Sequence, residues 1–111
     1  MPCGPGVLAV VAARGSGELP SGALVAARRA ARLGSNREAF SHYRRASDFV
    51  ERLPPAERGA VFEELATTAY VVGRLDDAFT AIREAIALYR QLGDSAAVGR
   101  CTRIEIGRAH V

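Results

Sequence analysis

Residues 73–94 read GRLDDAFTAIREAIALYRQLGD, and this stretch decides the fold. Small residues stand at Ala78 and Ala85, and the large apolar residue Ile82 lies between them. Spacings of three and four residues place all three on one face of a helix. A glycine at each end suits the left-handed backbone that terminates a helix. The stretch therefore predicts a helix whose slim face packs closely against a neighbour.

The same pattern occurs a second time, 39 residues earlier in the chain. Each copy has a glycine first, then a small residue, a large residue and another small residue. Such a repeat predicts helix pairs that stack, because one pair alone cannot bury its apolar stripe. The repeated positions are Gly34, Ala39, Tyr43 and Ala46 in the first copy, and Gly73, Ala78, Ile82 and Ala85 in the second.

Strong helix formers dominate the chain from Ala23 onward, and short breaks divide them. Pro54-Pro55 ends one helix and starts the next, since proline is tolerated in the first helical turn. Ser35 and Glu38 have the spacing of a capping box, in which both side chains bind amides at the helix start. We expect antiparallel hairpins built from helices over about 23–33, 37–52, 56–72, 76–91 and 95–105.

Three regions follow from this division. Residues 1–22 are rich in glycine and proline, so we expect a loose or mis-called N-terminal segment. Residues 23–105 hold the repeats, as hairpins over about 23–52 and 56–91 and a truncated third from 95. Residues 106–111 read IGRAHV and resemble the translation of a widely used sequencing adapter. We therefore expect a non-native tail on a fragment of a longer reading frame.

The second copy resembles the tetratricopeptide repeat (TPR). Ala66 stands where the first helix of that repeat must be slim, whereas Arg90 replaces its usual closing proline. The joint Leu53–Arg58 is longer than in the family, whose period is about 34 residues. The resemblance implies an all-α fold of antiparallel helical hairpins, stacked as a short TPR-like right-handed solenoid. The family's large and small slots are filled by Phe62, Leu65, Ala66, Tyr70, Gly73, Leu75, Ala78, Ile82 and Ala85.

A narrower resemblance extends over residues 26–94. The runs AARRAARLGSNREAFSHYRRA, ERLPPAER and GRLDDAFTAIREAIALYRQLGD are similar to the helical-repeat region of MalT-like members of the LuxR family. Those bacterial transcriptional regulators carry an AAA-type ATPase before the repeats and a DNA-binding helix-turn-helix after them. The resemblance implies a cytoplasmic, non-enzymatic segment for signal sensing and protein contact. No Walker motif or helix-turn-helix signature occurs in the chain itself.

Composition excludes several classes of protein. The longest apolar run, Val7–Ala13, is far too short to span a bilayer, so we expect no membrane partner. Two cysteines nearly a hundred residues apart make no disulfide framework and no metal site. The net charge is +3, and all 15 basic residues are arginine. Residues 22–50 hold six of them against two acids, which suits either an anionic partner or docking inside a larger protein.

Two alternative functions stay open. The glycine-rich N-terminus, with Val7–Ala13 before Gly15 and Gly17, superficially resembles a strand and a phosphate-binding loop of a nucleotide-binding or small catalytic domain. It lacks the Lys-Ser/Thr pair that such a loop uses to reach phosphate and magnesium. The arginine-rich first half suggests a nucleic-acid-binding helical domain, but aromatic residues are scarce and no reading motif is present. We therefore expect no direct nucleic-acid contact.

No catalytic constellation is evident. The adjacent carboxylates Glu63-Glu64 and Asp76-Asp77 point about 100° apart on a helix, so neither pair predicts a two-carboxylate site. We expect no catalytic residue, no metal and no cofactor.

The remaining candidate is the groove that the first helices of successive TPR hairpins line. The resemblance implies that this groove binds a protein partner, either neighbouring repeats or a regulatory protein. Arg28 and Arg32 are one turn apart and could jointly hold an anionic group. The candidate groove residues are Arg28, Arg32, Glu63, Thr67 and Tyr70.

Overall fold

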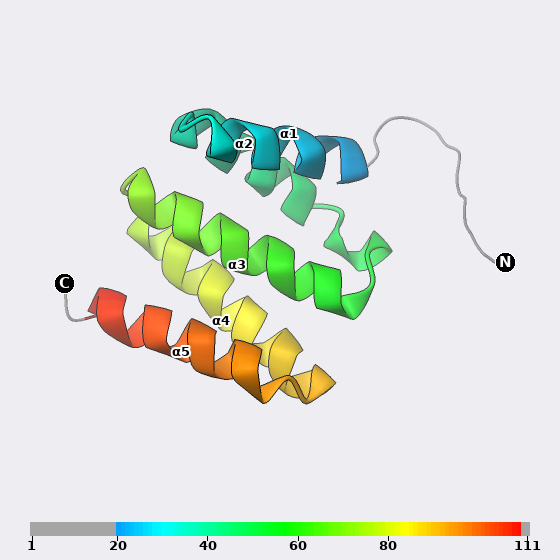
Figure 1. Cartoon of the computed structure of the whole chain (residues 1–111), viewed down its shortest axis with the longest axis vertical. Coiled ribbons are helices and arrows are strands. Elements are labelled where there is room, and N and C mark those ends of the chain that lie inside the picture. The colour runs from blue at the N-terminus through cyan, green and yellow to red at the C-terminus, as the bar shows by residue number, and fades with distance from the viewer. Residues whose placement is uncertain (1–19, 110–111) are drawn as a thin grey trace, which may run out of the picture.

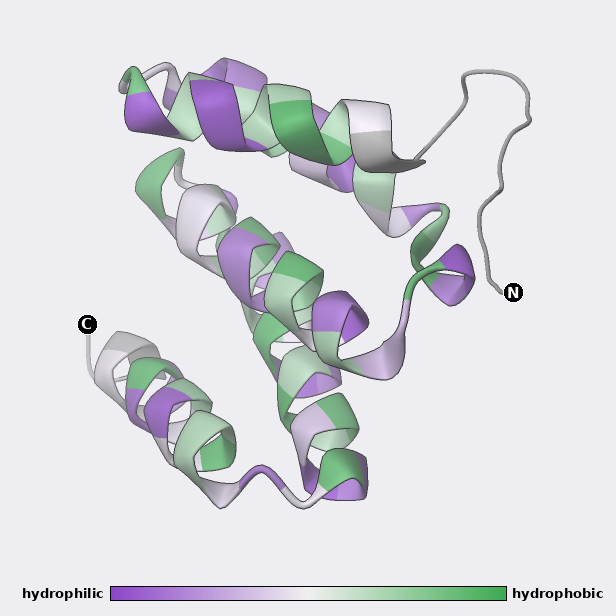
Figure 2. Cartoon of the chain, turned by 45° about the vertical axis from the view of Figure 1, so that its right-hand side comes forward, coloured by the Kyte–Doolittle hydropathy of each residue, from purple (hydrophilic) through white to green (hydrophobic). Residues whose placement is uncertain are grey.

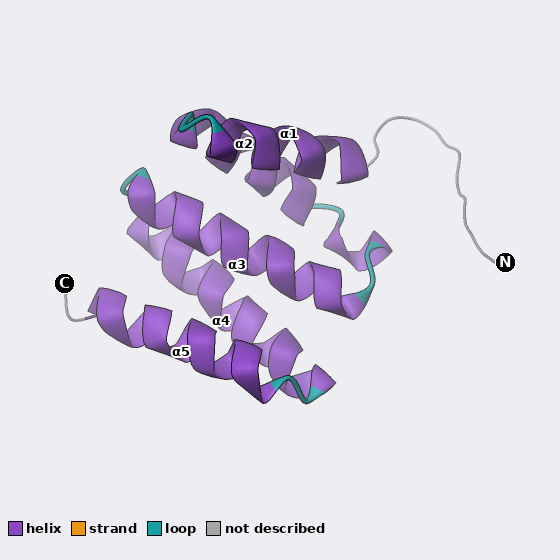
Figure 3. Cartoon of the chain, in the orientation of Figure 1, coloured by secondary structure: helices purple, strands orange, loops and turns teal. Residues whose placement is uncertain are grey.

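The computed structural model describes residues 20–109, and every element in that range is helical (Figure 3). The all-α prediction is therefore confirmed for this part of the chain. Helix α1 begins at Pro20, three residues earlier than expected, and α5 continues through Ala109, past the expected end at 105. The elements are α1 (Pro20–Arg32), α2 (Asn36–Ser47), the 3-10 helix η1 (Val50–Arg52), α3 (Pro55–Val71), α4 (Leu75–Leu92) and α5 (Ser95–Ala109).

Successive helices run antiparallel and form two layers (Figure 1). Helices α1, α3 and α5 lie side by side in the nearer layer, and α2 and α4 lie behind them. Each helix packs on the next one along the chain. The body is 20 Å thick in its shortest dimension, which matches two layers of helices about 10 Å across. None of the described helices is long and apolar enough to cross a membrane.

Three tight turns joining helices share one construction. Their glycines, Gly34, Gly73 and Gly93, have φ of +80°, +85° and +74°, which side-chain-bearing residues rarely adopt. Each glycine amide donates to a carbonyl three residues back, and the next amide donates to a carbonyl five residues back. This is the Schellman pattern, and it satisfies carbonyls at the end of each helix. The longer bonds join Ser35 to Ala30 (2.9 Å), Arg74 to Ala69 (2.8 Å) and Asp94 to Tyr89 (3.0 Å).

The capping box expected from Ser35 and Glu38 is wrong. Ser35 precedes α2, but its side chain makes no capping hydrogen bond. The Ser35 backbone has a ψ of 72°, away from the extended conformation that capping residues adopt. At the corresponding joint before α5, the Asp94 carboxylate does cap the helix, accepting from the Ala97 amide at 3.0 Å.

The second helix is shorter than the expected 37–52. It ends at Ser47, whose hydroxyl donates to the Arg44 carbonyl at 2.7 Å, and Val50–Arg52 forms a separate 3-10 turn. Serine side chains compete in this way for backbone carbonyls and so weaken helices. Pro54 and Pro55 then act as predicted: Pro54 precedes α3, and Pro55 occupies its first turn.

The core is built largely from alanine. Hydrophilic and hydrophobic residues alternate along the helices (Figure 2), and α1, α2 and α4 concentrate their apolar residues on one face, whereas α3 does not. The apolar faces meet between the layers, and small side chains there let the helices approach closely. The repeated small and large positions are all buried, with exposed fractions of 0 to 3%: Ala39, Tyr43, Ala46, Ala78, Ile82 and Ala85.

Helices α3 and α4 are in close contact where Gly59 faces Tyr89. A Cβ atom at position 59 would lie 2.8 Å from Cε1 of Tyr89, closer than non-bonded carbon atoms approach. Tyr89 itself is only 6% exposed, so its ring is enclosed by the fold. The ring therefore lies directly against the α3 backbone, and only glycine leaves room for it.

Replacing this glycine should destabilise the protein. We expect Gly59→Ala to lower the free energy of unfolding by about 1–2 kcal/mol, because overpacking costs more than the roughly 1 kcal/mol that alanine gains in helix propensity. Gly99→Ala is the matched control, since its Cβ would meet only Nη1 of Arg103, at 3.6 Å. The control should be neutral or stabilising. Urea unfolding of both variants tests this, and equal effects would contradict the contact.

Candidate interaction groove

A groove of about 470 Å³ opens along the middle of α3. Its walls come from α1 and α5, which flank α3 in the same layer, and from tyrosines of α2 and α4 beneath. The lining combines small, hydroxyl and charged side chains: Ala31, Tyr43, Ala60, Glu63, Glu64, Thr67, Thr68, Tyr89 and Arg100. We call this surface the α3 groove.

One wall of the α3 groove is fixed by Glu64. Its carboxylate accepts two hydrogen bonds from the Arg28 guanidinium, at 2.9 Å from Nε and 3.0 Å from Nη2. It accepts a third from the Tyr43 hydroxyl at 2.9 Å. Two-pronged charge-assisted pairs of this kind are among the stronger hydrogen bonds in proteins. Glu64 therefore links α3 to both helices of the first hairpin.

The opposite wall is fixed by the adjacent residue, Glu63. Its carboxylate accepts from Arg100 of α5, at 2.6 Å from Nε and 3.0 Å from Nη2, and from the Tyr89 hydroxyl of α4 at 3.1 Å. The ring of Tyr89 also lies 5.9 Å below the Arg100 guanidinium carbon. Glu63 therefore links α3 to the helices that follow it, as Glu64 links it to those that precede it.

The two carboxylates diverge because neighbours on a helix point about 100° apart. Glu63 and Glu64 therefore hold separate partners on opposite sides of α3. This geometry gives α3 one anionic contact on each side. Two further interhelical ion pairs join Arg83 of α4 to Glu105 of α5, at 3.1 Å, and Arg44 of α2 to Asp77 of α4, at 3.7 Å.

Burial and charge act together on the first cluster. The Tyr43 phenol has a pKa above its ordinary value, first because it is buried and then because it donates to Glu64. The pKa of Arg28 is also raised, mainly by its hydrogen bond to Glu64. Both shifts favour the protonated form of the donor, so the phenol and the guanidinium keep the protons that they donate to Glu64.

The second cluster has the same character. The Arg100 hydrogen bond lowers the pKa of Glu63 below its usual range. Burial and the Glu63 charge raise the pKa of Tyr89 to about 12. The fully buried thiol of Cys101 lies nearby, and burial followed by the Glu63 charge raises its pKa to about 11. A thiol held protonated in this way is a poor nucleophile and a poor metal ligand.

The structure brings together only part of the groove predicted from the sequence. Glu63 and Thr67 line the α3 groove, and the exposed Thr67 hydroxyl donates to the Glu63 carbonyl at 3.1 Å. Arg28 reaches the wall, but as the partner of Glu64, so it is not free to share an anion with Arg32. Arg32 is exposed at the end of α1, and Tyr70 packs beside the core; neither lines the groove.

Seven of the nine lining residues were not selected as groove residues from the sequence, and four of them carry the polar contacts across the groove. Tyr43 was assigned only a packing role, and Glu64, Tyr89 and Arg100 were not selected at all. The available signal was the Glu63-Glu64 pair itself, with arginines on the helices before and after it. Choosing the correct arginines depends on how far each helix slides along α3, and repeat spacing alone does not fix that.

Comparisons with known proteins found no match. No protein-family model, no curated protein and no solved structure matches the chain. Within residues 20–109, no group of three or more histidine, cysteine, aspartate or glutamate side chains could hold a metal ion. The glycine-rich stretch considered for phosphate binding, and Cys3, lie outside the described residues.

The Glu63 cluster predicts an acid-sensitive contribution to stability. The folded-state pKa of Glu63 lies below the ordinary 4.5, so its contribution is complete above that pH and is lost as pH falls through the folded value. We expect the wild type to be more stable than Glu63→Gln at pH 7, and the gap to narrow steadily below about pH 4.5.

The control is Glu84→Gln, which removes an exposed carboxylate that has no partner among the described residues. Urea unfolding between pH 3 and pH 7 provides the measurement. A gap for Glu63→Gln that does not change with pH, or that matches the control, would refute the assigned ion pair.

Proposed function

We propose that the chain is a non-enzymatic, protein-binding helical-repeat segment in which TPR-like hairpins stack as a right-handed solenoid. The observation that carries the proposal is the α3 groove, formed where three first helices lie in one layer. A stack of this kind presents a continuous surface made of one element per hairpin, which suits an extended peptide or a helix of a partner.

The chemistry of the groove favours contact over reaction. Glu63 and Glu64 each already accept three hydrogen bonds, so neither is poised as a general base. The thiol of Cys101 is buried and protonated, and the Thr67 hydroxyl is engaged with the backbone of its own helix. What the groove offers is a rigid, polar wall with spare acceptor positions on the carboxylate oxygens.

The cytoplasmic regulator context rests on the sequence resemblance to the repeat region of MalT-like regulators. In such a parent, this segment would transmit the presence of a partner from the repeats to an ATPase and a DNA-binding end. The uninterrupted genomic reading frame on both sides of residues 23–105 tests this part directly. Finding neither an ATPase nor a helix-turn-helix there would refute it.

A selection experiment tests the groove. A random peptide library displayed on phage is enriched on the immobilised full chain, and the affinities of recovered peptides are measured by calorimetry. We expect binders that Thr67→Arg weakens by about tenfold or more, because a long side chain on the groove floor would exclude the peptide.

The matched control is Thr80→Arg, which makes the same change at an exposed position on α4, in the other layer. It should leave affinity within about twofold, as surface substitutions away from a site usually do. Recovery only of peptides that are indifferent to Thr67→Arg would refute the proposed use of the groove.

A further inference from the structure

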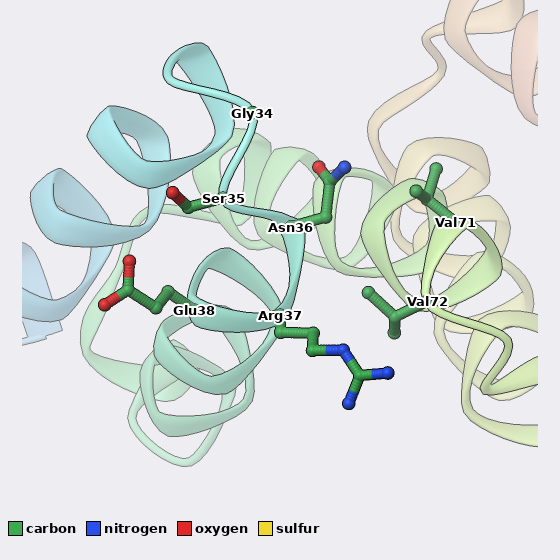
Figure 4. A pocket seen from close by; sticks show the side chains of 7 residues that line it. All are labelled: Gly34, Ser35, Asn36, Arg37, Glu38, Val71 and Val72. Atoms are coloured by element: carbon green, nitrogen blue, oxygen red, sulfur yellow. The ribbon is translucent and has the colours of Figure 1, made fainter.

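A second hollow lies at the edge of the body where the α1–α2 and α3–α4 turns come together. Its volume is about 550 Å³, and it shares no lining residue with the α3 groove. Asn36 and Arg37 point across the gap toward Val71 and Val72, whereas Glu38 points away from it (Figure 4). We call this surface the turn-edge hollow.

Exposed apolar side chains gather at this edge. Leu33 is 75% exposed, Val71 is 56% exposed and Leu75 is 47% exposed. These are three of the five exposed large apolar residues that the described part of the chain contains, and each lies in one of the two turns or at the helix end beside it. Single exposed apolar residues are ordinary, but a cluster beside a concave surface marks an interaction site.

The charged side chains at the turn-edge hollow indicate which kind of partner could bind there. Arg37 has no hydrogen-bond or ion-pair partner among the described residues, and it faces the valines across the gap. An apolar group seated against Val72 would remove water from this guanidinium, which is costly unless an anion accompanies it. Asp77 does not supply that anion, since Arg74 already holds it at 3.0 Å.

We propose that the turn-edge hollow docks a peptide segment of a partner protein that presents an aliphatic or aromatic side chain beside a carboxylate. The apolar side chain packs on Val71 and Val72, and the carboxylate pairs with Arg37. The hollow favours a protein over a lipid surface, because its concave lining can enclose a single side chain and the neighbouring carboxylate. The site is separate from the α3 groove and does not depend on the function proposed for it.

The test uses the full chain carrying Thr67→Arg, so that binding at the α3 groove is blocked. Selection from a random dodecapeptide library should enrich peptides that combine leucine, isoleucine or phenylalanine with aspartate or glutamate. Their affinities are then measured by fluorescence anisotropy. We expect Val71→Asp and Arg37→Glu each to weaken binding by about tenfold, the loss typical of a central interface contact.

The controls make the same charge changes at the opposite edge, near the α4–α5 turn (Figure 1). Leu92→Asp matches Val71→Asp, and Arg90→Glu matches Arg37→Glu; both control positions are exposed. These controls should alter affinity by less than about twofold. Circular dichroism of every variant establishes that the helices are retained, so that a loss of binding is not a loss of folding.

Several results would overturn the proposal. If basic peptides or no peptides are enriched, the proposed apolar and acidic partner is refuted. If the control substitutions reduce affinity as much as Val71→Asp and Arg37→Glu do, the proposed location of the site is refuted. If the chain sediments with phosphatidylcholine–phosphatidylserine vesicles, and Val71→Asp abolishes this sedimentation, the surface binds lipid instead. A dimer in light scattering that the same substitution dissociates would assign it to a second copy of the chain.

Discussion

The architecture depends on close approach between helix backbones, which only small side chains allow. Alanines at both repeated positions of α2 and α4 are fully buried, and Gly59 of α3 admits the ring of Tyr89 against its backbone. With larger residues at these points the two layers would move apart, and the side chains that now meet over α3 would lose their reach. Close packing of the helices in the interior therefore determines which polar side chains can reach one another on the surface over α3.

The ion pairs are a consequence of that nesting. Each is partly exposed, and exposed pairs typically stabilise a protein by only about 0–1 kcal/mol, so their main effect is on geometry. Glu63 and Glu64 differ by one position and so hold opposite neighbours. The central helix is thereby fixed relative to α1 and to α5. A groove whose walls are tied in this way is pre-organised, which reduces the ordering that accompanies binding of a partner.

The two concave surfaces differ in chemistry. The α3 groove is polar, and its formal charges are neutralised within the protein. The turn-edge hollow combines the exposed Val71 and the partly buried Val72 with Arg37, which has no partner among residues 20–109. The α3 groove therefore suits a partner that donates further hydrogen bonds to carboxylates already paired within the protein. The turn-edge hollow suits a partner that brings both apolar surface and negative charge.

Sequence pattern alone was enough to predict the helical content, the approximate places where helices begin and end, and the use of glycine at the turns. These features are local: alanine-rich periodicity, the left-handed glycines and Pro54-Pro55 act over a few residues, so a pattern can reveal them. The early end of α2 was not predicted because the Ser47 hydroxyl binds a carbonyl of its own helix, and no local signal distinguished the uncapped Ser35 from a capping serine. Only the tertiary structure decided which arginine meets which glutamate. Arg28 and Glu64 are 36 residues apart, and Glu63 and Arg100 are 37 apart, and their pairing depends on how far packed helices slide past one another. That displacement is set by the summed fit of many buried side chains, which no single stretch of the chain encodes.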